Sequence, residues 1–90
     1  MRAIVTVIGA DRPGIIANVS ARLFKANANI LDINQTVLQG EFFAMTMLVD
    51  LKDLSCDFKQ LKASLEEGGE ELGVEIRLQR EEIFNSMHRV

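Results

Sequence analysis

Several residue types are scarce in this 90-residue sequence, and their scarcity excludes whole classes of protein. Tryptophan and tyrosine are absent, and the five phenylalanines lie in apolar patterns, so no aromatic platform for stacking nucleic-acid bases is offered. The net charge is −3 with acids and bases interspersed, which argues against the basic face that nucleic-acid binding requires. The single cysteine, Cys56, cannot form an internal disulfide, and we expect a reduced, cytoplasmic setting.

Long apolar runs and recognisable catalytic motifs are also missing. No run of about 18 apolar residues occurs, so we expect no membrane span. The N-terminus enters a strand pattern at once, without the features of a secretory signal. The single histidine, His88, has no cysteine or carboxylate pair beside it, and no known nucleophile or phosphate-loop motif occurs. The sequence therefore predicts no catalytic residue, no metal, no cofactor, no direct nucleic-acid partner and no membrane partner.

What is present is a strong apolar pattern that suits one small domain over residues 1–90. Hydrophobic residues make up 48% of the chain, and no linker or low-complexity tract divides it. The periodicities predict strands and helices in the order β-α-β-β-α-β. We expect strands over 2–8, 29–38, 41–51 and 74–79, helices over 14–26 and 56–70, and a short terminal helix over 81–89.

The ends of these elements carry their own residue signals. Asn27 to Asn29 suits the end of the first helix, and Gln39-Gly40 is a hairpin turn signal. Ser55 and Asp57 are candidate caps of the second helix. We expect the glycine pair at 68–69 to weaken and interrupt the end of that helix, and Gly73 to stop it.

This order predicts an α+β, ferredoxin-like sandwich. Right-handed crossovers give a four-stranded antiparallel sheet with both helices on one face, the first and third strands central, and the second and fourth at the edges. The third strand is apolar on both faces, so something should cover its second face. The terminal segment could cover part of it, and a second copy the rest, which predicts a homodimer or higher homo-oligomer. The two apolar sets are Phe43, Met45, Met47 and Val49, and Phe42, Ala44 and Leu48, while the terminal segment offers Ile83, Phe84 and Met87.

The turn between the first strand and first helix carries the clearest hint of chemistry. A strand that ends in a glycine-containing turn and feeds a helix presents unpaired backbone N–H groups to an anion. Asp11 could bind an α-ammonium group, the N–H groups around Gly14 an α-carboxylate, and Arg12 could add its charge. Alternatively, Asp11 is only the helix N-cap, Pro13 occupies the first turn and Arg12 is solvated.

A second group of polar residues lies on the second predicted strand. Asp32 and Asn34 share one face of that strand, with Asn29 and Gln35 nearby, and could line a pocket between subunits. The alternative is an edge strand kept polar to prevent aggregation.

The segments IGADRPGII, ANVSARLF and ANILDINQTVL, with a hairpin into FFAMTMLVDL, resemble an ACT domain over essentially the whole chain. Such domains are small ligand-sensing modules of amino-acid metabolism. The ending EEIFNSMHRV is similar to that of short bacterial ACT proteins and of the ACT repeats of a glycine-cleavage regulator. The resemblance implies dimerisation through the sheet or helices, with an amino acid bound at a domain interface. It places the pocket at the first loop and at the second-strand start of a neighbouring copy: Gly9, Ala10, Asp11, Arg12, Pro13, Gly14, Ile15, Asn29, Ile30 and Asp32.

Together these observations predict a non-catalytic regulatory module. It would bind a small amino acid or related metabolite at a homodimer interface and signal to a protein partner. Two alternatives stay open: a structural protein–protein interaction module without a small-molecule ligand, and a small enzyme whose site needs two chains.

Overall fold

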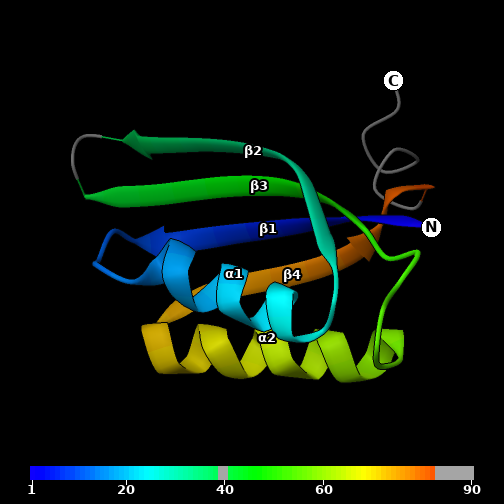
Figure 1. Cartoon of the computed structure of the whole chain (residues 1–90). Helices are drawn as coiled ribbons and strands as arrows, with labels where there is room; N and C mark the ends of the chain where they lie inside the picture. The colour runs from blue at the N-terminus through cyan, green and yellow to red at the C-terminus, as the bar shows by residue number, and fades with distance from the viewer. Residues whose placement is uncertain (39–40, 83–90) are drawn as a thin grey trace.

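A computed structural model describes residues 1–38 and 41–82, and they form four strands and two helices (Figure 1). The first and last residues of these strands and helices all lie within two residues of the predicted positions. The predicted turn at 39–40, the predicted helix beyond Glu82, and His88 lie outside the described residues. The strands are β1 (Arg2–Ala10), β2 (Asn29–Leu38), β3 (Phe42–Asp50) and β4 (Val74–Arg80), and the helices are α1 (Ile15–Lys25) and α2 (Phe58–Leu72).

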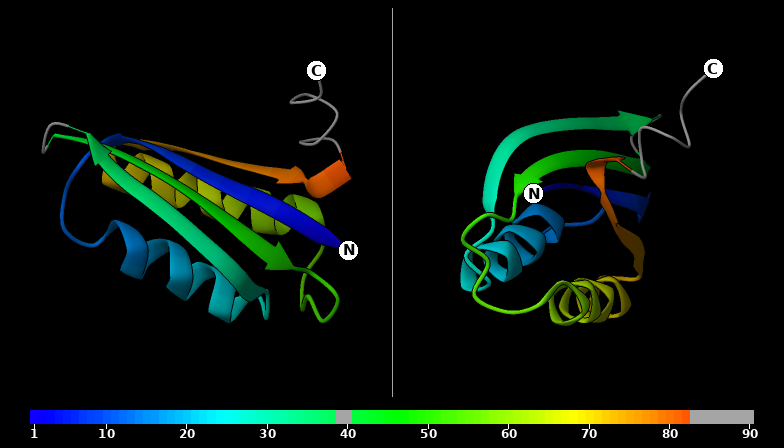
Figure 2. Two further views of the ribbon diagram at one scale, coloured as in Figure 1. Left: turned by 90° about the horizontal axis from the view of Figure 1, so that it is seen from above. Right: turned by 90° about the vertical axis from the view of Figure 1, so that its right-hand side faces the viewer.

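The four strands form one antiparallel sheet in the order β2-β3-β1-β4. This order confirms that β1 and β3 are central and that β2 and β4 are the edges. Both helices lie on the same side of the sheet, so neither α1 nor α2 covers its second face (Figure 2). The predicted ferredoxin-like βαββαβ arrangement is therefore confirmed. Neither α1 nor α2 is long and apolar enough to cross a membrane.

The core lies between the sheet and the two helices. Alternate residues of β3 point into it, as the strand pattern predicted, because Phe43, Met45, Met47 and Val49 are all buried. They meet buried side chains from the apolar rows of both helices, such as Val19 and Leu23 on α1 and Leu61 and Leu65 on α2. The other parity of β3 lies on the open face, where Phe42 is exposed and Ala44 and Leu48 are half-buried.

The expected interruption of the second helix at its glycine pair is wrong. Helix α2 continues through Gly68 and Gly69 to Leu72. A Cβ atom on Gly69 would lie 2.7 Å from the carbonyl oxygen of Val74, and one on Gly68 would lie 2.6 Å from Nε of Arg22. The glycines therefore allow α2 to approach β4 and α1 closely, and this packing outweighs their low helix propensity.

The predicted helix ends are confirmed. Gly73 follows α2 in a left-handed conformation with φ +70°, and Asn27 follows α1 with φ +62°. Glycine and asparagine both tolerate the left-handed conformation, and a residue in this conformation ends a helix.

Candidate functional site

Helix α1 begins without a side-chain cap, which defines the chemistry of the loop before it. Gly14 is the N-cap residue, with φ +90° and ψ −1°, and no side chain accepts a hydrogen bond from the first turn. The alternative in which Asp11 is the N-cap is therefore wrong, as is the placing of Pro13 in the first turn. Asp11 lies three residues before Gly14, and its backbone N–H donates to the Glu41 carbonyl oxygen at 2.8 Å, which ties the loop to the start of β3.

The first turn of α1 leaves backbone donors available. The N–H of Asn18 donates to the Gly14 carbonyl oxygen at 2.9 Å, so the three preceding N–H groups, of Ile15, Ile16 and Ala17, have no acceptor inside the helix. No acidic residue lies in this turn to occupy them. Together with the positive end of the helix dipole, these donors suit a carboxylate or another small anion. Ile15 is itself buried, so it would contribute its backbone and not its side chain.

Arg12 is exposed, but a structural contact holds its guanidinium group. Its Nη1 atom donates to the carbonyl oxygen of Leu72 at 2.8 Å. Leu72 is the last residue of α2, so the cation lies at the negative end of that helix dipole. Arg12 is thus not simply solvated, and it links the loop to the α2–β4 turn. No signal in the sequence could show this contact, because the two residues are 60 positions apart.

The remaining residues of the predicted loop lie at the end of β1. Gly9 and Ala10 are the last residues of this strand, opposite Phe43 and Phe42 of β3. A Cβ atom on Gly9 would lie 2.6 Å from Cγ1 of Val74. Gly9 therefore serves close packing between β1 and β4, whether or not a ligand lies nearby.

The predicted second half of the site lies at the far end of the sheet. Asn29 at the start of β2 is opposite Asp50, and Asp50 is opposite Arg2 at the start of β1, whereas the loop follows the end of β1. One chain therefore does not bring Asn29, Ile30 and Asp32 together with residues 9–15. Only a neighbouring copy could supply them to the loop.

Asp32 and Asn34 share one face of β2, as predicted. This face is the open face of the sheet, since the two residues are opposite Leu48 and Thr46. Asp32 follows a β-bulge at Leu31, and its Oδ1 atom accepts a hydrogen bond from the N–H of Ile33 at 2.9 Å. One of its carboxylate oxygens thus already stabilises the bulged backbone, and the other remains for a ligand.

Large apolar side chains are exposed along α1 and β2. Ile33 and Val37 lie opposite Met47 and Phe43 and so point to the helix side of the sheet, yet they are 42% and 43% exposed. The helix layer therefore does not cover this part of the edge strand. On α1, Phe24 is 85% exposed and Ile16 is also exposed. We call these exposed apolar side chains, Ile16, Phe24, Ile33 and Val37, the α1–β2 surface.

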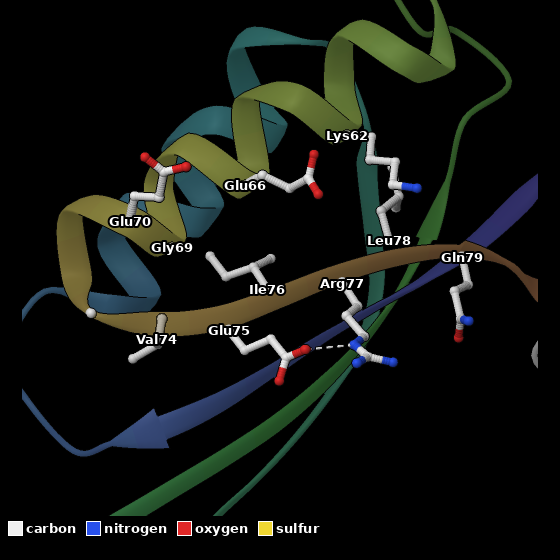
Figure 3. A pocket seen from close by; sticks show the side chains of 11 residues that line it. Lys62, Glu66, Gly69, Glu70, Val74, Glu75, Ile76, Arg77, Leu78 and Gln79 are labelled. Carbon is white, nitrogen blue, oxygen red and sulfur yellow. Dashed lines mark hydrogen bonds and ion pairs between the residues drawn. The ribbon is translucent and has the colours of Figure 1, made fainter.

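A groove between α2 and β4 is a feature that the sequence reasoning missed (Figure 3). It has a volume of about 820 Å³ and lies beside the turn to which Arg12 is bonded. Charged side chains of Lys62, Glu66 and Glu70 form its α2 wall. Their position beside β4 depends on the tertiary packing at Gly69, which no local pattern in the sequence indicates.

Known proteins resemble this chain in sequence and in structure. The ACT domain family model matches residues 2–79. A UPF0237 protein of Methanopyrus kandleri is 54% identical over 89 residues, which cover 99% of this chain and 98% of that protein. The structure of an ACT domain protein from Streptococcus pneumoniae matches with a TM-score of 0.79 and 43% identity over 93% of both chains. The regulatory subunit of aspartate kinase from Thermus thermophilus matches with a TM-score of 0.66 and 26% identity, over 87% of this chain and 50% of that one.

Proposed function

The chain belongs to the ACT domain family of regulatory, ligand-binding modules, and from this premise we propose that it senses a small amino acid or related metabolite without catalysing a reaction. The observation that carries the proposal is the uncapped start of α1. In the proposed complex the ligand carboxylate accepts hydrogen bonds from the free N–H groups of the first turn, and the carboxylate of Asp11 receives the α-ammonium group.

The proposed site is shared between two copies of the chain. The loop supplies the anion site, and residues 29–32 of a neighbouring copy supply polar groups that the same chain holds at the other end of its sheet. The exposed apolar α1–β2 surface supports association, because burying each large side chain contributes roughly 1.5–3 kcal/mol. A ligand bound there would stabilise the dimer as well as the fold.

The proposed signal to a protein partner needs a ligand that binds two states of the assembly with different affinity. Arg12 offers a physical route, because its side chain joins the loop to the α2–β4 turn through Leu72. A change in the loop on binding would then alter the position of Arg12, and with it the surface beside α2 and β4.

The proposal contains no catalytic step. Asp11 and Arg12 are the ionisable side chains of the loop, and their charges suit an ammonium and a carboxylate group respectively. The UPF0237 relative is not named for an enzymatic activity.

Thermal shift and calorimetry with each amino acid at millimolar concentration test this proposal. We expect at least one amino acid to stabilise the protein, and Ala17→Glu to abolish that stabilisation by placing a carboxylate among the same N–H donors. Ala21→Glu is the matched control: Ala21 is exposed, lies one turn later, and gives the same change in charge outside the first turn. Binding by none of the amino acids would overturn the sensor proposal.

A structural interaction module is the second candidate, and the 85% exposure of Phe24 favours it. A protein partner that binds in stoichiometric amount, regardless of added amino acids, would support this function in place of sensing. Loss of that binding in Phe24→Ala, with an unchanged unfolding curve, would assign the contact to α1.

A further inference from the structure

One exposed face of α2 carries bases in its first half and acids in its second half. The residues of this face recur at helical spacing, and all of them are exposed: Lys59, Lys62, Glu66 and Glu70. We call these four residues the charged row of α2. Figure 3 shows three of them, Lys62, Glu66 and Glu70, along the groove between this helix and β4. The row therefore has opposite charges at its two ends.

This order of charges is the reverse of what the helix dipole favours. The first turn of α2 holds no acidic residue, and its last turn holds no basic residue. Instead, Lys59 lies in the first turn, at the positive end of the dipole, and Glu70 lies in the last turn, at the negative end. Both ends of the row are thus charged in the sense that the helix itself disfavours.

The chain compensates these charges on the side of α2 that faces α1, but not along the charged row. On the α1 side, Nη2 of Arg22 forms an ion pair with Oε1 of Glu71 at 3.0 Å. Within the described part of the chain, no member of the charged row forms an ion pair. The row is therefore available to a partner that brings anions to its first half and cations to its second half.

We propose that α2 pairs antiparallel with α2 of a second copy of the chain, about a two-fold axis midway along the charged row. In this register Lys62 of each copy lies opposite Glu66 of the other. Lys59 of each copy likewise lies opposite Glu70 of the other. The symmetry repeats both pairings, and it also brings each basic end close to the negative end of the other helix dipole.

The surface around the axis allows two helices to approach each other. Ala63 is exposed and follows Lys62, so a small side chain lies near the centre of the row, where a long one would hold the helices apart. The groove beside the row gives the lysine and glutamate side chains of a second copy space to extend toward their partners.

A second copy of the chain satisfies both ends of the row at once. A basic segment of another protein would meet like charges at Lys59 and Lys62, and an acidic surface would meet them at Glu66 and Glu70. An antiparallel α2 carries acids and bases in the reverse order at the same spacing. Exposed ion pairs are individually weak, so we expect a weak association that low salt favours and whose register the charges set.

This interface goes beyond the proposed ligand site and does not rest on it. The ligand proposal uses the loop before α1, residues 29–32 of a neighbouring copy and the α1–β2 surface. No member of the charged row belongs to any of these, so the chain can use both interfaces in one assembly.

Disulfide cross-linking of the full chain tests the pairing. Ala63→Cys, in a chain that also carries Cys56→Ser, places one thiol of each copy close to the two-fold axis. We expect a cross-linked dimer of twice 10.1 kDa, with a yield that rises with protein concentration and falls in high salt. Ala21→Cys in the same Cys56→Ser chain is the matched control, because Ala21 is exposed but lies on α1.

Charge reversal in the Ala63→Cys chain tests the register. Lys62→Glu places a carboxylate opposite Glu66 at both symmetric positions and should lower the association constant by about tenfold. Adding Glu66→Lys restores opposite charges and should return the cross-linking yield to its starting level. Lys52→Glu is the control, since Lys52 is exposed, precedes α2 and undergoes the same change of charge.

Each of three results would overturn the α2 pairing. They are cross-linking through Ala63→Cys no greater than through Ala21→Cys, an equal effect of Lys52→Glu and Lys62→Glu, and a double variant that stays dissociated. Binding of polylysine to the acidic half of the row, without any self-association, would instead assign the row to another protein. The amino-acid titrations proposed above would be unaffected by any of these results.

Discussion

The two helices on the covered face of the sheet begin in opposite ways. Helix α2 starts with a complete capping box: Oδ1 of Asp57 accepts from the N–H of Gln60 at 2.8 Å, and Oε1 of Gln60 accepts from the N–H of Asp57 at 3.0 Å. Helix α1 starts at Gly14 with no side chain in either role. In α2 the side chain of Asp57 satisfies one first-turn donor, the N–H of Gln60, whereas no side chain accepts from the first turn of α1. The comparison locates the candidate site at α1 by a physical difference between two elements of one fold.

The two N-cap residues differ in backbone conformation as well as in side chain. Asp57 has an extended conformation, φ −83° and ψ 168°, from which its carboxylate reaches the first turn. Gly14 has φ +90°, a conformation that L-residues rarely adopt. The residue that begins α1 is therefore a glycine without a side chain to cap the helix, and the proposed anion binding at this turn rests on that residue.

Among the variants that test this comparison, Gly14→Ala should lower the free energy of unfolding the most. A Cβ atom there would meet nothing within 4 Å, so the cost is that of the left-handed backbone alone, about 1–2 kcal/mol of unfolding free energy. Urea unfolding measures this loss of stability. Gly14→Asn should lose less unfolding free energy than Gly14→Ala, because asparagine tolerates positive φ. An alanine variant as stable as the wild type would show that the loop does not need this conformation.

Removing the cap of α2 should have the next largest effect. Asp57→Ala deletes the acceptor for Gln60 and should cost about 1 kcal/mol. Asp53→Ala, four residues earlier and also exposed, is the control for the loss of one negative charge. Equal unfolding midpoints for the two variants would mean that the capping box contributes nothing. Amino-acid binding at α1 should be unchanged in both, since neither touches the loop.

These two helix starts also show what the sequence could and could not predict. The Asp57-x-x-Gln60 spacing, the glycine at 73 and the alternation in β3 act over a few residues, and each was predictable from its local chemistry. The alternative that Asp11 caps α1 is wrong, because an aspartate before a helix is a common cap signal and the positive φ of Gly14 cannot be read from a sequence. Local signals thus gave the fold and located the loop, but not the loop geometry.

The contacts that shape the candidate site are long-range. Arg12 reaches Leu72, and Gly69 is tolerated inside α2 because Val74 packs against it. The two halves of the proposed pocket lie at opposite ends of the sheet in one chain, which only the strand register reveals. Such features depend on how elements pack, and no single segment contains them.

The smallest change in the free energy of unfolding should come from giving the first turn of α1 a carboxylate of its own. Ala17→Glu adds a carboxylate to the first turn, near the free N–H groups and the positive end of the helix dipole, and should raise the unfolding free energy by about 0.3–1 kcal/mol at low salt. Ala21→Glu lies beyond that turn and should give a smaller gain, since the dipole effect falls off within one turn. High salt should remove the difference between the two variants by screening these exposed charges. Identical stabilities at low salt would indicate that the donors of α1 are already satisfied, and would remove the physical basis for an anion at this helix start.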